Sequence, residues 1–403
     1  MNQQKAVQIW IIFVSIQECT VFKINRLLFL FSFLACLSAL HAQTTLDSIA
    51  KHKKVFGFAP LADTIPKDKS GLFVLPLLYF TPDTRWAAGA AGVYYFKVKP
   101  KLPTDELPRV SYLQFLADYT QNRQLDTWAT WQVFTRNENF LLKGDIRYRD
   151  FPDRFYGIGN NTSKAQEEKY SYNLFVLKSL QLKKIKPGFF LGFDYEFRSE
   201  FNFSLAPNGQ LAAGSITGSS GGFGSALGLV GVIDTRDNII NPYKGRLAEL
   251  STYFFTQPLG STFSFQVING VYQQYWQIRP KQVLAFQFKS RLSFGDVPFL
   301  DLSTLGNDDI LRGYPKNRFR DRHFAATQLE YRFPLWWRFG AVAFAGVGDV
   351  FGPSSDLTIQ NLKYSIGTGL RFVVDPAERL NIRLDYGYGS EGGYFYFLVG
   401  EAF

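Results

Sequence analysis

The 403-residue sequence predicts an all-β fold, a closed antiparallel transmembrane β-barrel of about sixteen strands. The first observation is composition: 17% of the residues are aromatic, yet the mean hydropathy is only -0.08. Membrane-spanning helices would be more apolar, whereas a barrel strand alternates outward apolar with inward polar residues. The second observation is a series of alternating segments of membrane-strand length. The third is an aromatic end, Phe403, which is typical of the recognition signal of outer-membrane barrels.

The alternating segments begin at Gly71 and have the length that tilted membrane strands require. We expect strands at 71–80, 85–98, 109–121, 125–136, 139–150, 169–182, 187–200, 223–234, 245–257, 261–276, 282–295, 322–335, 338–351, 361–375, 378–390 and 392–403. An even strand number places both ends of the barrel on the periplasmic side.

Two segments, 286–294 and 380–386, separate apolar from charged residues with a period of two. Lys289 or Arg291 facing lipid at mid-depth would cost about 2 to 4 kcal/mol, so the charged face is expected to line the lumen. The alternative is a soluble β-sandwich with one wet face, but a sandwich gives no reason for an aromatic C-terminal residue.

The N-terminal part is expected to be an export signal. Lys23 and Arg26 precede an apolar run, Leu27 to Leu40, and residues 38–42 form a cleavage zone. We therefore expect a signal region at 1–42, including an over-extended start, a periplasmic tether at 43–70 and the barrel at 71–403. An alternative is a lipoprotein signal ending at Cys36. Both cysteines of the chain, Cys19 and Cys36, fall in this removable region, so no disulfide is expected in the mature protein.

A polar loop precedes the expected strand at 322–335 and carries Leu311, Arg312, Gly313 and Tyr314. A guanidinium presents a fixed fork of donors, so an arginine buried in a lumen needs a carboxylate or several carbonyls. The alternative is an exposed loop arginine.

A second motif lies between the eighth and ninth expected strands. It consists of Asp234, Arg236, Asp237, Pro242 and Gly245. Asp237 favours a tight turn, Pro242 fixes φ, and Gly245 relieves the chain where it re-enters the sheet, so a periplasmic turn is expected here.

Together, these motifs and their places in the strand count resemble the BamA/TamA family of outer-membrane insertion barrels, also called the bacterial surface antigen family. The resemblance implies that the long sixth outer loop folds into the lumen and that Arg312 pairs with an acid of the inner wall. The family's usual Asp position is occupied by Gly346. Glu330 and Asp385 have inward parity, and we expect Glu330 as the first partner and Asp385 as the second. The family's periplasmic polypeptide-transport-associated domains do not fit into residues 43–70.

The first and last strands meet at the seam of such a barrel. Pro76 lacks the N–H that a sheet ladder requires, and Gly392, Gly393 and Gly400 are weak pairing residues. A loosely paired seam would admit a client strand by edge pairing. The alternative is a tolerated irregularity without a gating role.

The sequence favours no enzymatic reading. The only histidines expected in the mature chain are His52 and His323, and the Gly-rich loop around Ser219 lacks a nucleophile elbow. No metal-ligand spacing or phosphate-binding loop is present, so no cofactor is expected. The excess of Lys and Arg, 44 against 34 acids, indicates a cationic lumen and rims facing lipopolysaccharide rather than nucleic-acid binding.

The function expected from the resemblance is insertion or translocation of proteins, or of lipids, as an integral protein of the Gram-negative cell outer membrane. The expected partners are outer-membrane lipid and lipopolysaccharide, unfolded outer-membrane protein clients, and accessory periplasmic or lipoprotein subunits. The alternative is a passive pore on the same scaffold.

Overall fold

A computed structural model describes residues 11–14, 70–81, 85–96, 98, 111–306, 308–376 and 379–403. The expected signal region, apart from 11–14, and the whole tether up to residue 69 lie outside these residues. Within the described ranges no helix has the length and apolar character needed to cross a membrane.

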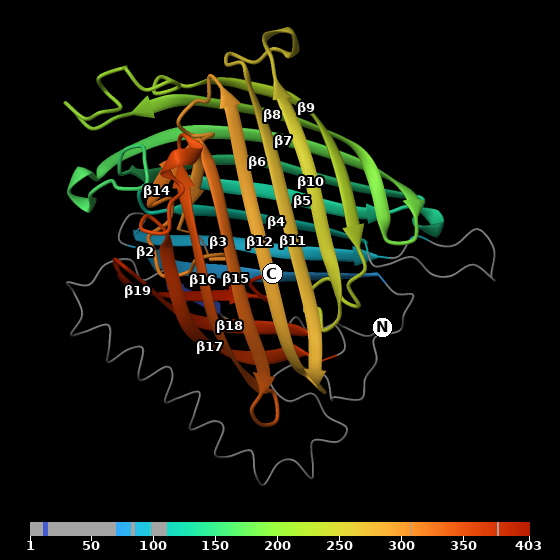
Figure 1. Cartoon of the computed structure of the whole chain (residues 1–403). Helices are drawn as coiled ribbons and strands as arrows, with labels where there is room; N and C mark the ends of the chain where they lie inside the picture. Colours follow the sequence, from blue (N-terminus) through green and yellow to red (C-terminus); the bar gives the residue numbers. More distant parts are fainter. Residues whose placement is uncertain are drawn as a thin grey trace.

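Sixteen strands of the described chain form one large antiparallel sheet, in which each strand pairs with the next along the chain (Figure 1). The strands are β2 (Gly71–Thr81), β3 (Arg85–Phe96), β4 (Ser111–Thr120), β5 (Leu125–Phe134), β6 (Phe140–Phe155), β7 (Glu168–Lys186), β8 (Phe189–Ser204), β9 (Gly222–Asp234), β10 (Gly245–Phe255), β11 (Phe265–Arg279), β12 (Gln282–Gly295), β15 (His323–Pro334), β16 (Phe339–Phe351), β17 (Lys363–Asp375), β18 (Leu380–Gly389) and β19 (Gly392–Val399).

The sheet curls into a barrel in which red β19 returns toward blue β2 (Figure 1). The all-β barrel with sixteen membrane strands is therefore confirmed. A further short strand, β1 (Ile11–Val14), pairs in parallel with Leu77–Phe80 of β2. β1 belongs to the segment that the sequence predicts to be removed on export.

The remaining elements are short. β13 (Ser303–Leu305) and β14 (Phe319–Asp321) form a small hairpin within the loop between β12 and β15. Four 3-10 turns lie in other connections, at Arg136–Glu138, Lys164–Gln166, Gln257–Leu259 and Ser354–Asp356.

Side chains alternate as the pattern predicts. On β18 the inward residues Asn381, Arg383 and Asp385 are buried, whereas Tyr386 and Tyr388 of the other face are exposed. The exposed apolar residues include Phe193, Leu229, Leu250, Leu329 and Ile366, which gives the outer face the apolar character of a lipid-facing wall.

Several strand ends differ from the expectation, and the end of the last strand bears on the site. The last strand was expected to run over 392–403, but β19 ends at Val399. Gly400 adopts a φ of 88°, and its N–H donates to the carbonyl of Asn381, so the segment 400–403 leaves the line of β19. Phe403 lies beside Tyr275 of β11, with ring centroids 6.2 Å apart.

Candidate functional site: the loop inside the barrel

The loop between β12 and β15 is the sixth outer loop in strand order, and its tip is buried. Leu311 and Arg312 are 0% exposed and Tyr314 is 2% exposed. The tip packs with Leu305, Ile310 and Phe319 of its own loop against Phe324, Ala326 and Val350 of the wall. The loop therefore folds back into the barrel, as the resemblance implies.

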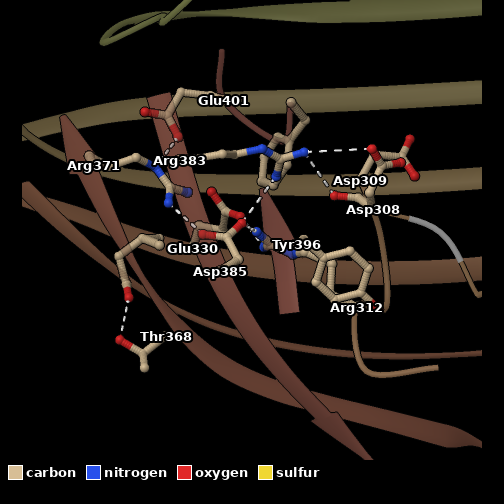
Figure 2. A network of polar contacts seen from close by, with 12 residues as sticks. Asp308, Asp309, Arg312, Glu330, Thr368, Arg371, Arg383, Asp385, Tyr396 and Glu401 are labelled. Carbon is tan, nitrogen blue, oxygen red and sulfur yellow. Dashed lines mark hydrogen bonds and ion pairs between the residues drawn. The ribbon is translucent and has the colours of Figure 1, made fainter. Parts of the chain in front are cut away.

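Arg312 lies at the centre of the tip, between two acids of the inner wall (Figure 2). Its guanidinium donates from Nη2 to Glu330 of β15 and from Nη1 to Asp385 of β18, the latter at 2.5 Å. Both carboxylates are 0% exposed, and the guanidinium lies 3.5 Å from the ring centre of Phe344. Glu330 and Asp385 are the two partners expected from the sequence, and both contact Arg312.

The acids belong to a larger charge network that the sequence did not predict (Figure 2). Glu330 also accepts from Arg332, and Asp385 also accepts from Arg371 and Arg383. Glu401 then joins Arg371 at 2.8 Å. Each of these residues has inward parity on its strand or lies just beyond β19. The alternation of side chains could have identified these arginines as inward-facing. Which acid each arginine contacts depends on the register between neighbouring strands, which the alternation does not give.

The position that usually carries the family's acid is Gly346. A Cβ added there would lie 2.8 Å from the carbonyl oxygen of Thr327 and 3.3 Å from Cδ2 of Leu311. The loop residue Leu311 thus occupies the space in front of Gly346. Asp349, which has the opposite parity, accepts a hydrogen bond from Asn160 rather than from the loop tip.

The rest of the tip is held by β17, β18 and β19. Ser365 donates to the carbonyl of Arg312, and the Tyr314 hydroxyl donates to the carbonyl of Tyr364 at 2.7 Å. The backbone of β18 comes close to the loop at Gly387, where a Cβ would lie 2.6 Å from the main chain of Arg312. A glycine is therefore required where loop and wall meet.

Both arms of the loop carry further anchors. Asp301, on the arm leaving β12, pairs with Arg198 of β8. Arg318, on the returning arm, pairs with Glu391 at 2.6 Å and donates to the carbonyl of Thr162. The loop is consequently tied to three other outer segments or strands as well as at its tip.

The periplasmic turn motif folds as a closed unit between β9 and β10. Asp234 accepts two side-chain hydrogen bonds from Arg236, and Asp237 accepts from the N–H groups of Tyr243 and Lys244. Gly245 has a φ of 96°, which favours glycine. Pro242 is buried.

The same turn reaches another turn at the periplasmic end. Arg379, between β17 and β18, donates to Asp237 at 2.8 Å and lies 4.0 Å from the ring centre of Tyr243. Burial alone would raise the pKa of the Asp237 carboxyl, but the hydrogen bonds from Arg379 and from the backbone outweigh burial and hold the pKa below its ordinary value.

The seam residues named from the sequence lie at or near the two end strands. Pro76 lies within β2, which continues through it, and the register pairs it with Ala90 of β3. Gly392 and Gly393 begin β19, and Gly392 has a φ of 117° in the tight turn after β18. Gly400 follows the last residue of β19.

Within the part of the chain that the structure describes, no group of three or more His, Cys, Asp or Glu side chains has a geometry that could hold a metal ion. The described charges at the loop tip are paired with one another, so the arrangement holds a segment in place.

A closed barrel with an apolar outer face and a loop latched inside its lumen defines a class, the outer-membrane β-barrels. A family model confirms this class: residues 114–403 match the Omp85 superfamily domain. The chain belongs to the Omp85 superfamily.

Among solved structures, the chain is similar to the crystal structure of BamA from Haemophilus ducreyi lacking POTRA domains 1–3. The sequence identity is 12% and the TM-score 0.52, and the match covers 90% of this chain and 77% of that one. A search of curated proteins found no match. At this identity the structural likeness supports the fold, and it agrees with the BamA/TamA-like barrel that the motifs indicated.

Proposed function

We propose that the chain inserts or translocates polypeptides as an integral protein of the Gram-negative outer membrane, with unfolded outer-membrane proteins as its client class. The observation that carries the proposal is the latch: a loop in the lumen is bound through Arg312 to β15 and β18, and through other tip contacts to β17 and β19. These strands form the side of the barrel that ends at the seam. A passive channel has no need to tie its lumenal loop to that side.

The buried loop also argues against the pore reading. Freeing the tip would break the buried hydrogen bonds of Arg312 to Glu330 and Asp385, and a hydrogen bond to a charged group contributes about 1.5 to 3 kcal/mol. The resting barrel therefore keeps its lumen occupied. A route between the end strands needs less rearrangement, because the last strand has only eight residues, Gly392–Val399, and an edge strand can pair with an incoming one.

The proposed partners follow from the surfaces. Lipid and lipopolysaccharide would contact the apolar outer wall, and lipid is a second candidate cargo. Accessory periplasmic or lipoprotein subunits would bind at the periplasmic end. The proposed tether at 43–70, which lies almost wholly outside the described residues, is one place for such binding.

A disulfide lock across the seam tests the proposal. Cysteines at facing positions near Leu75 of β2 and Phe397 of β19 would join the end strands. We expect oxidation to stop client insertion, reduction to restore it, and ion conductance to stay nearly unchanged. The readout is the outer-membrane proteome of cells that depend on the variant.

The control is a disulfide between two strands that already pair, Ala117→Cys with Thr127→Cys in β4 and β5. This control should leave insertion intact in both redox states. Full insertion by the protein with a locked seam would overturn the lateral route and leave the pore as the better reading.

A further inference from the structure

The last strand, β19, makes a direct contact with the loop tip through Tyr396. The Tyr396 hydroxyl accepts a hydrogen bond from the N–H of Gly313 at 2.8 Å and donates to the carbonyl of Tyr314 at 3.2 Å. One side chain of the end strand thus satisfies two main-chain groups of the Arg-Gly-Tyr tip. Because buried main-chain groups need partners, the tip depends on where β19 lies.

The segment that follows β19 reaches the same site from the other side. Glu401 is 2% exposed in its side chain and accepts from Arg371 at 2.8 Å and from Asn381 at 2.6 Å. Arg371 in turn binds Asp385, which binds Arg312. Figure 2 shows Arg371 between Glu401 and Asp385.

A second path joins the same two ends. Glu330 binds Arg312 and also accepts from Arg332 at 3.0 Å. Arg332 donates to the main-chain oxygen of Phe403 at 2.8 Å. Both partners of the loop arginine are therefore one arginine away from the segment 400–403.

The charge balance makes these paths dependent on each other. Four nearly buried guanidinium groups, those of Arg312, Arg332, Arg371 and Arg383, meet three buried carboxylates, those of Glu330, Asp385 and Glu401. The exposed Asp308 lies 3.9 Å from Arg383. If Glu401 left, four cations would face two buried acids, and an uncompensated buried charge is costly.

We propose that Tyr396 and Glu401 are positioning residues that couple the lumenal loop to the end strand of the seam, so that release of the loop and displacement of β19 favour each other. The coupling is reciprocal, because a contact present only when both parts are in place changes both equilibria by the same factor. The inference rests on the proposed function for its biological meaning, but the coupling itself is a property of the protein alone.

The first test measures loop release from β19 variants. Ile310→Cys, buried in the tip, is introduced into a Cys19→Ser/Cys36→Ser background, and its labelling by a maleimide is followed in purified protein. Tyr396→Phe should speed labelling about five- to 150-fold, the range that two lost hydrogen bonds give. Glu401→Gln should speed it further, because it removes a charge from the network.

The matched control is Tyr394→Phe on the same strand, because the Tyr394 hydroxyl accepts from Lys164 and not from the tip. Its labelling rate should equal that of the parent. Equal rates in Tyr396→Phe, Glu401→Gln and the control would overturn the proposal.

The second test runs in the opposite direction. Arg312→Lys keeps the charge but removes the forked donor, and hydrogen exchange of the β19 amides is compared with that of β9. We expect faster exchange in β19 and unchanged exchange in β9. Faster labelling of Ile310→Cys without faster exchange in β19 would show that latch and strand are independent. Neither readout includes a client, so a failed insertion assay would leave this result standing.

Discussion

Two chain reversals of this barrel are each held by an arginine and a carboxylate, and their surroundings differ. At the loop tip, Arg312 and its acids are 0% exposed, whereas in the periplasmic turn Arg379 and Asp237 keep about a third of their side-chain surface, 27% and 30%. The comparison shows that the same pair of groups can lock one segment and only orient another. Water screens the second pair and is excluded from the first.

The largest expected effect on stability comes from removing the arginine of each pair. Arg312→Ala should destabilise the barrel by about 3 to 6 kcal/mol, because it removes two buried hydrogen bonds between charged groups, those to Glu330 and Asp385, which contribute about 1.5 to 3 kcal/mol each. Arg379→Ala should cost at most about 1 kcal/mol. The measurement is the temperature at which each variant loses its folded migration in detergent gels. Equal shifts for the two variants would refute the distinction.

A smaller effect should come from the wall rather than from a charge. Gly387→Ala places a Cβ 2.6 Å from the main chain of Arg312, so the tip must move, at a cost of about 1 to 3 kcal/mol. Gly231→Ala on β9 is the control, since its nearest neighbour is Cδ1 of Leu191 at 3.7 Å. Protease cleavage of the loop should increase only in Gly387→Ala, and a protected loop in that variant would contradict the close fit.

The smallest effect concerns acid. The pKa of Asp237 is lowered in the folded protein, so this carboxyl stabilises the turn above its unfolded pKa and loses that contribution as pH falls through the lower folded value. We expect the contribution to be lost below a pH of about 4. Asp237→Asn should flatten this acid dependence of folded gel migration. An unchanged acid profile would show that the turn gains nothing from the charge.

Much of the fold could be predicted from the sequence, because apolar and polar side chains must alternate along membrane strands. The segment predicted at 282–295 coincides with β12, and the one at 223–234 starts one residue after β9 begins. β6 and β7 run past the predicted 139–150 and 169–182. β6 continues through 151–155, where Pro152, Asp153 and Arg154 interrupt the apolar alternation, and β7 continues through the lysine-rich 183–186, which carries no lipid signal. The hairpin of β13 and β14 went unpredicted because three-residue strands are too short for a period.

The site could be predicted from the sequence only in part. Parity and the position of the loop pointed to Glu330 and Asp385, and both contact Arg312. The contact of Tyr396 with Gly313 depends on how far the loop descends, and the contact of Glu401 depends on the turn at Gly400. Neither the depth of the loop nor the direction of the chain after Gly400 can be predicted from a local sequence pattern.

The glycines facing the loop tip have a consequence for the shape of the lumen. Gly346, Gly387 and Gly389 lie on neighbouring parts of the inner wall, and added Cβ atoms there would meet Leu311, Arg312 and Tyr314 respectively. At these glycines the main chain of the wall has no side chain of its own facing the lumen. The side chains that cover it there belong to the loop. Withdrawing the loop would therefore remove part of the lining as well as a plug, and the bore would widen at these glycines of β16 and β18.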